Sequence, residues 1–107
     1  PGPGRTTTPP RGRVSVPFTY ILECADGTLY TGWTTDLIRR LEAHQRGVAS
    51  RYTRGRRPVR LVYWEEHPTR CAAQRREAAL RRLSRPQKLA LIASVAEHLQ
   101  DLKGAIA

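Results

Sequence analysis

The chain has 107 residues, with 19 lysines and arginines against 9 aspartates and glutamates, which gives a formal net charge of +10 at pH 7. This length supports one domain with a modest core, and the excess positive charge predicts attraction to polyanions. No apolar run approaches the ~20 residues that a membrane span needs, and no secretory signal pattern begins the chain. We therefore expect a cytoplasmic protein without membrane contact.

The basic residues are nearly all arginine, because Lys88 and Lys103 are the only lysines. Arginine makes planar, bidentate contacts with phosphate, which favours nucleic acid as the partner, although a GC-rich genome would also favour arginine codons. The two cysteines, Cys24 and Cys71, form no metal-binding spacing. We expect them to be reduced thiols in or near the core.

Residues 1–16 are rich in proline, glycine, threonine and arginine. They carry too little apolar surface to offset the entropy of ordering, so we predict a flexible tail, followed by a domain over residues 17–104. An alternative role for the tail is contact with a phosphate backbone through Arg5, Arg11 and Arg13.

A β-hairpin is predicted after the tail. Strand-forming residues run from Phe18 to Cys24 and again from Leu29 to Trp33, and the Asp26-Gly27 pair between them is a turn signal. Gly32 interrupts the second strand, and a glycine at such a position often marks a bulge or a close backbone approach.

A helix is predicted directly after the hairpin. Thr34 or Thr35 is expected to cap it, Asp36 in its first turn suits the positive end of the helix dipole, and Gly47 is expected to end it. Leucines four residues apart form its inner stripe. An adjacent polar stripe is made by Asp36, Arg40 and His44.

Residues 48–57 are predicted to form a basic loop with four arginines and a tyrosine. Clustered guanidinium groups beside an aromatic ring suit a nucleic-acid backbone and an unstacked base, whereas the simpler alternative is a solvated loop. The residues expected to bind nucleic acid are Arg39, Arg51, Tyr52, Thr53, Arg54, Arg56 and Arg57.

A third strand is predicted over residues 58–65. Both of its faces are partly apolar, so Tyr63 and Trp64 are interpreted as packing residues rather than as base-stacking residues. A second helix is predicted from Arg70 to Leu83, with Thr69 as its cap.

Glu77 lies at the edge of the apolar stripe of this second helix. A carboxylate that faces the protein body is costly unless a cation neutralises it, so the partner of Glu77 is either an arginine or a metal ion. The number of nearby arginines favours an arginine. Arg76, Arg81 and Arg82 are themselves expected on the solvated side or near phosphates.

The residues from Ser84 to Gln87 form a capping box with a proline just inside the helix start. The third helix is predicted to run to about Lys103 and to end at Gly104. Together the elements predict an α+β fold, a small mixed sheet of three strands flanked by helices in the order ββαβαα.

Two tyrosine tripeptides, Phe18-Thr19-Tyr20 and Tyr30-Thr31-Gly32, precede the helix that carries Arg40 and His44. The run Tyr52-Thr53-Arg54-Gly55-Arg56-Arg57-Pro58 and the tripeptide Leu83-Ser84-Arg85 follow. In combination, from about residue 17 to 91, these segments resemble the GIY-YIG nuclease superfamily, specifically its small, single-domain bacterial branch. The first motif keeps only its tyrosine. Larger members place an asparagine beyond the glutamate, and this chain has none.

The resemblance implies an active site made of Tyr20, Tyr30, Arg40, His44 and Glu77, with Glu77 as the ligand of one Mg²⁺ or Mn²⁺ ion. One carboxylate is enough, because such an ion takes the rest of its shell from water and phosphate. Arg40 would neutralise the scissile phosphate. Either tyrosine could orient or deprotonate the attacking water, provided that a cation lies close to the phenol. His44 is a second candidate base, or only a hydrogen-bond partner.

The leading hypothesis is a divalent-metal-dependent endonuclease that hydrolyses DNA phosphodiester bonds. We expect it to be guided by DNA structure, such as branches or damage, rather than by sequence, which suggests a role in DNA repair. The alternative from another class is a non-catalytic, basic nucleic-acid-binding module that keeps the fold. A third interpretation is an RNA-associated protein. The sequence leaves the oligomeric state open.

Overall fold

The structure, a computed structural model, describes the backbone of residues 16–106 and the side chains of residues 16–95. The predicted order ββαβαα is confirmed, with one additional short helix between the first long helix and the third strand. The tail predicted for residues 1–16 lies, except for Val16, outside the described residues.

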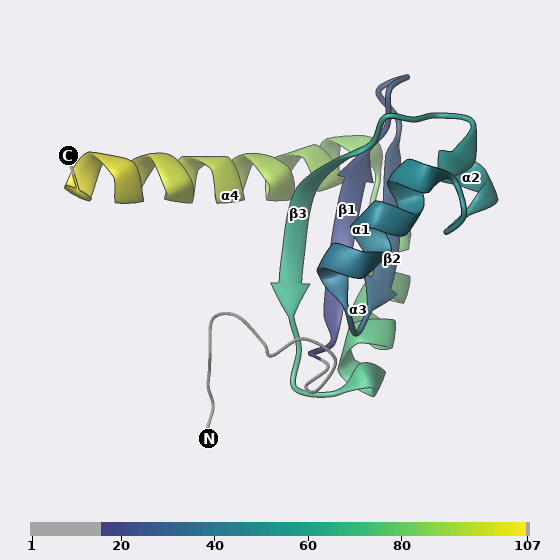
Figure 1. Cartoon of the computed structure of the whole chain (residues 1–107). Helices are drawn as coiled ribbons and strands as arrows, with labels where there is room; N and C mark the ends of the chain where they lie inside the picture. The colour runs from purple at the N-terminus through teal and green to yellow at the C-terminus, as the bar shows by residue number, and fades with distance from the viewer. Residues whose placement is uncertain (1–15, 107) are drawn as a thin grey trace.

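The sheet has three strands, β1 (Phe18–Glu23), β2 (Leu29–Thr34) and β3 (Arg60–Glu66), in the order β2-β1-β3. Both neighbours run antiparallel to β1, so the prediction of a mixed sheet is wrong. The strands β2 and β3 run in the same direction, but β1 lies between them and no parallel pair forms (Figure 1).

A β-bulge shifts the register of β3 against β1. Ile21 pairs with Tyr63, whereas the next residue, Leu22, pairs with Leu61, which leaves Val62 as an extra residue on β3. As a result, Leu61 packs on one face of the sheet, while Val62 and Tyr63 both pack with the cluster on the other face.

The hairpin turn has the Asp-Gly geometry that was predicted. Gly27 has a φ of 84°, which a residue without a Cβ adopts at little cost. The Asp26 carboxylate accepts hydrogen bonds from the Thr28 backbone N–H at 3.0 Å and from the Thr28 hydroxyl at 2.6 Å. The turn is therefore closed by its own side chain.

The helix α1 (Leu37–Arg46) covers one face of the sheet (Figure 1). Its cap is Asp36, whose carboxylate accepts a hydrogen bond from a first-turn N–H at 3.1 Å, so the predicted caps Thr34 and Thr35 are wrong. Thr34 instead accepts a hydrogen bond from the Asp36 N–H at 3.1 Å. The predicted end is confirmed, since Gly47 caps the helix with a φ of 81°.

The short helix α2 (Arg51–Arg54) lies inside the segment that was predicted as a loop. Ser50 caps it, because its hydroxyl accepts hydrogen bonds from the N–H groups of Tyr52 at 3.0 Å and Thr53 at 3.3 Å. A single helical turn is too short to show the periodicity from which helices are predicted.

The helix α3 (Arg70–Arg81) packs against β1 and β2 on the face opposite α1. Its predicted cap is confirmed, since the Thr69 hydroxyl accepts a hydrogen bond from the Ala72 N–H at 3.0 Å. Ala73 and Leu80 are buried, and they lie on the same side of the helix as Glu77.

The helix α4 (Arg85–Ile106) packs against β3 and extends beyond it (Figure 1). The predicted capping box is present: the Ser84 N–H donates to the Gln87 side chain at 2.9 Å, and the Gln87 N–H donates to the Ser84 hydroxyl at 3.3 Å. The helix continues past the predicted end at Gly104.

Each face of the sheet carries its own apolar cluster. The cluster under α1 is formed by Tyr20, Leu22, Cys24 and Val59, with Tyr30, Leu37, Leu41 and Leu61 around it. The cluster under α3 and α4 is formed by Ile21, Tyr63 and Leu80, with Leu29, Val62, Leu83, Leu91, Ile92 and Val95 around it. The sheet is thus the middle layer of three.

Two residues that were expected in the interior are exposed. Trp64 is 45% exposed, because β3 is an edge strand, and Cys71 lies on the open side of α3. Tyr63 and Cys24 are buried as expected. Within the described residues, we find no helix whose length and apolar character would let it cross a bilayer.

Candidate active site

A buried hydrogen-bond chain joins β1 to α1 and α2. The Tyr20 hydroxyl lies 2.8 Å from His44 Nε2, and His44 Nδ1 lies 2.8 Å from Thr53 Oγ1. The three residues are shielded from solvent, with exposed fractions of 2%, 1% and 0%. Packing of the two helices on the sheet therefore assembles this series of hydrogen bonds from separate parts of the sequence.

Neutral His44 has one nitrogen that carries a proton and one with a free lone pair, so it donates one of these two hydrogen bonds and accepts the other. The hydroxyls of Tyr20 and Thr53 can each take the complementary role.

The environment keeps both Tyr20 and His44 neutral at pH 7. Burial, with a smaller contribution from the positive charge of Arg40, lowers the pKa of His44 to about 4. Burial also raises the pKa of Tyr20 well above its ordinary value. A neutral imidazole and a neutral phenol can make both hydrogen bonds.

Charged residues from two helices act on the Tyr20 hydroxyl. After burial and Tyr30, the pKa of Tyr20 is affected by Arg40, which lowers it, by Glu77, which raises it, and by Arg81, which lowers it. Glu77 therefore lies within electrostatic reach of Tyr20, although α3 and α1 cover opposite faces of the sheet.

Gly32 explains how the Tyr20 ring fits. A Cβ at this position would lie 2.6 Å from the Tyr20 hydroxyl oxygen and 2.8 Å from its Cζ. The same Cβ would lie 3.2 Å from Cε2 of Tyr30. The interruption predicted at Gly32 is thus a close approach to an aromatic side chain rather than a bulge, because the pairing of β1 with β2 is regular.

Tyr30 lies between the buried chain and the surface. Its ring centroid is 5.2 Å from that of His44 and 6.5 Å from that of Tyr20. Its ring centroid also lies 5.8 Å from that of Tyr52. Tyr30 is half-buried, and its hydroxyl makes no hydrogen bond within residues 16–95, so it is the more accessible of the two predicted catalytic phenols.

The neighbouring arginines Arg39 and Arg40 of α1 differ in what surrounds them. Arg40 precedes His44 by one turn, and its positive charge lowers the pKa values of both His44 and Tyr20. It is exposed and has no acidic partner among the described side chains. Arg39 is also exposed, and its backbone N–H donates to the Asp36 carboxylate at 3.1 Å.

Glu77 has an arginine partner, as the sequence on its own favoured. Arg81 Nη2 lies 3.0 Å from Glu77 Oε2, and the same nitrogen donates to the Thr31 carbonyl oxygen at 3.4 Å. Glu77 is partly buried, with 19% of its side chain exposed. Arg81 therefore connects Glu77 to β2 between Tyr30 and Gly32.

Tyr20, Tyr30 and His44 thus pack together, and the charges of Arg40 and Glu77 act on Tyr20, so this arrangement can be compared with known proteins. The GIY-YIG catalytic domain matches residues 16–90. The chain belongs to the GIY-YIG family.

Similar GIY-YIG relatives occur in bacteria and archaea. A "UPF0213 protein" from Streptococcus sanguinis is 52% identical over 75 residues, covering 70% of this chain and 86% of that protein. A UPF0213 protein from Halobacterium salinarum is 50% identical over 72 residues, covering 67% and 94%. The solution NMR structure of the protein EF2693 from E. faecalis is 36% identical, with a TM-score of 0.52 over 76% of this chain and 86% of that chain.

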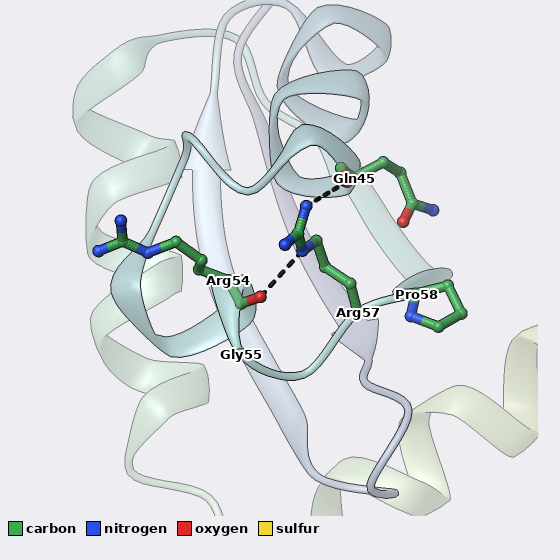
Figure 2. A pocket seen from close by; sticks show the side chains of 5 residues that line it. All are labelled: Gln45, Arg54, Gly55, Arg57 and Pro58. Carbon is green, nitrogen blue, oxygen red and sulfur yellow. Dashed lines mark hydrogen bonds between the residues drawn. The ribbon is translucent and has the colours of Figure 1, made fainter.

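The arginines in the basic segment of this GIY-YIG domain fall into two groups. Arg57 donates to the backbone carbonyls of Arg54 at 2.9 Å and Gln45 at 3.3 Å, as Figure 2 shows, and Arg56 is also bound within the protein. The side chains of Arg51 and Arg54 are exposed and form no hydrogen bond or ion pair among the described residues. They are the cations of this segment that are free to contact phosphate.

A shallow pocket of about 420 Å³ lies beside Arg57 (Figure 2). Its lining contains none of the predicted catalytic residues: it is formed by Gln45, Arg54, Gly55, Arg57 and Pro58. The pocket is therefore separate from the candidate site, and the Arg54 side chain points away from it (Figure 2).

Thr53 was expected to bind nucleic acid, and the structure corrects this. Its side chain is fully buried and its hydroxyl bonds to His44, so it supports the site from inside. Arg81 is on the solvated side as expected, with 57% of its side chain exposed, and it also pairs with Glu77. The spacing of four residues on one helix is the sequence signal that could have revealed this pair.

A second polar cluster fastens α3 to the sheet. Arg76 makes a bidentate contact with Glu65, with distances of 2.9 Å from Nε to Oε1 and from Nη2 to Oε2. The Tyr63 hydroxyl also donates to Glu65, and His67 Nε2 lies 3.0 Å from Thr19 Oγ1. Burial raises the pKa of Glu65, but the bonds from Arg76 and Tyr63 outweigh it and lower that pKa. Arg76 is thus paired rather than solvated.

Proposed function

We propose that this chain is a divalent-metal-dependent endonuclease that hydrolyses DNA phosphodiester bonds and recognises DNA by structure rather than by sequence. The observation that carries the proposal is the 2.8 Å contact between Tyr20 and neutral His44, within reach of the charges of Arg40 and Glu77. The match to a catalytic-domain family and the net charge of +10 support a polyanionic substrate.

The residues near Glu77 fit Mg²⁺ or Mn²⁺. Glu77 offers a hard carboxylate whose Oε1 is not engaged by Arg81, and the buried Thr31 hydroxyl has no hydrogen-bond partner among the described residues. Among the described side chains of residues 16–95, no group of three or more His, Cys, Asp or Glu residues could hold a metal ion without further ligands. An ion at Glu77 would complete its shell from water and phosphate and would stabilise the charge that develops on the phosphate.

The other residues have roles that follow from their exposure. Arg40 is exposed and always charged, so it can neutralise the non-bridging oxygens of the scissile phosphate. Tyr30 has an uncommitted hydroxyl and can orient the attacking water. Tyr20 is buried and bound to His44, so we assign this pair to holding the site in shape rather than to direct attack.

A non-catalytic nucleic-acid-binding module is the second candidate. One observation favours it: Arg81 already neutralises Glu77 at 3.0 Å, so a metal ion must share or displace this guanidinium. Arg81 is 57% exposed, and an exposed ion pair of this kind contributes little stability, so its displacement is cheap. The pair therefore does not prevent metal binding.

Cleavage assays separate the two candidates. Nicked, branched, single-stranded and fully paired DNA are incubated with the protein in Mg²⁺, in Mn²⁺ and in EDTA. We expect cleavage that requires the metal and that falls at least about 100-fold in Glu77→Ala and in Arg40→Ala, as the loss of a transition-state contact does. DNA binding should be kept in Glu77→Ala.

Matched variants control for general loss of charge. Glu42→Ala and Arg75→Ala remove exposed side chains that have no described partner, and both should cleave like the wild type. Wild-type protein that binds all four DNAs and cleaves none of them in either metal would make the binding module the correct function.

A further inference from the structure

Tyr52 carries a stack of planar groups that begins at the surface. The Arg56 guanidinium carbon lies 4.0 Å from the centroid of the Tyr52 ring. The Tyr30 ring centroid lies 5.8 Å from that of Tyr52, with an angle of 32° between the ring planes. The His44 ring centroid lies 5.2 Å from that of Tyr30. The series thus leads from exposed Tyr52 to the buried chain of the candidate active site.

The Arg56 guanidinium is held in place over Tyr52. Its Nε lies 3.0 Å from the Asp26 carboxylate, and its Nη1 donates to the Tyr52 carbonyl oxygen at 2.8 Å. The backbone is tied as well, because the Ala25 N–H donates to the Arg56 carbonyl oxygen at 2.8 Å. The carboxylate of Asp26 offsets the charge of Arg56, so this arginine offers a flat face more than a free charge for phosphate.

We propose that Tyr52 and Arg56 form a stacking platform for an unpaired nucleobase, so that the substrate class is DNA with an extrahelical or single-stranded nucleotide beside the cleaved bond. This inference rests on the proposed nuclease function. A base stacks on an aromatic ring or a guanidinium plane regardless of its identity, which matches recognition by structure.

The position of the platform supports this substrate class. In the proposed function the Tyr30 hydroxyl orients the attacking water, and the Tyr30 ring centroid lies 5.8 Å from that of Tyr52. A base on the platform therefore belongs to a nucleotide close to the scissile phosphate. Only a base that has left the helical stack can reach such a surface, and this costs least where the base is already unpaired. Arg51 and Arg54, which are exposed on the same short helix, are available for the adjoining phosphates.

Binding without metal tests the platform separately from catalysis. In EDTA, affinity is measured for two labelled duplexes that differ only in one extrahelical adenine. We expect wild-type protein to prefer the bulged duplex by about tenfold, within the range that base–aromatic stacking contributes. Tyr52→Leu should lose this preference for the bulged duplex, and Tyr52→Phe should keep it. Arg51→Ala should weaken binding to both duplexes equally.

A spectroscopic readout covers the case in which Tyr52→Leu fails to fold. With 2-aminopurine as the extrahelical base, stacking on the platform should quench its fluorescence when wild-type or Tyr52→Phe protein binds. Equal affinity of wild-type protein for the two duplexes, or unquenched 2-aminopurine in the complex, would overturn the platform. In that case the stack only ties α2 to the hairpin turn. Cleavage of nicked DNA in Mg²⁺ would still report on the nuclease function, so failure of one proposal is distinct from failure of the other.

Discussion

Replacing Gly32 by alanine tests the geometry at the centre of the candidate site. The new Cβ would lie 2.6 Å from the Tyr20 hydroxyl oxygen and 2.8 Å from Cζ, which is closer than carbon atoms approach such groups. Tyr20 is 2% exposed and is bound to His44 at 2.8 Å, so its ring cannot move away without breaking that hydrogen bond.

The expected cost has two parts. Overpacking a filled site costs about 1 to 3 kcal/mol, and loss of the Tyr20–His44 hydrogen bond adds about 1 kcal/mol. We therefore expect Gly32→Ala to lower the free energy of unfolding by about 2 to 4 kcal/mol. At this chain length, the midpoint of thermal unfolding should fall by roughly 10 °C or more.

Urea and thermal unfolding, followed by circular dichroism, measure this change. Gly55→Ala is the matched control, because a Cβ there meets nothing within 4 Å and φ is −87°, so we expect little change. The double variant Gly32→Ala/Tyr20→Phe lacks the oxygen in the 2.6 Å contact, so it should be less destabilised than the sum of the single variants, by at least about 0.5 kcal/mol. If Gly32→Ala unfolds like Gly55→Ala, the packing of Tyr20 against Gly32 is wrong.

Three further predictions concern groups around this site. The pKa of His44 is about 4 in the folded protein and about 6.5 in the unfolded chain, so the stability that neutral His44 contributes is complete above pH 6.5 and is lost as the pH falls towards 4. Urea unfolding should therefore show the free energy of unfolding falling by up to about 3 kcal/mol over this range in the wild type but not in His44→Gln. Glu65→Gln should cost about 1 to 2 kcal/mol in the same assay, since it weakens a partly exposed bidentate pair, whereas the exposed neighbour in Glu66→Gln should cost much less. Cys71 should react with a thiol reagent in the folded protein, and Cys24 should react only after unfolding; two fast thiols would contradict the burial of Cys24.

The local signals of the sequence predicted most of the secondary structure. Gly27, Gly47, Thr69 and the Ser84 capping box lie where the structure has a turn, a helix end and two helix starts. Such signals depend on contacts within a few residues, so the sequence nearby is sufficient to define them. The short helix α2 escaped prediction because one turn contains no periodic pattern.

The candidate site was predicted only as a set of residues. The tyrosine motifs, Arg40, His44 and Glu77 came from the resemblance to a family, and their catalytic roles stay predictions. The structure added what surrounds them, such as the bond from His44 to Thr53 and the contact of Arg81 with the Thr31 carbonyl. These pairs join residues that are 9 and 50 positions apart.

The sequence by itself determined the fold class, the ends of most elements and the family to which the chain belongs. The tertiary structure alone decided that β1 lies between β2 and β3, that Trp64 and Cys71 are exposed, and that Thr53 is buried against His44. The physical reason is that burial and hydrogen-bond partners depend on which elements approach one another in space. A cap or a turn glycine acts within its own few residues, whereas a buried imidazole requires a strand and two helices to meet.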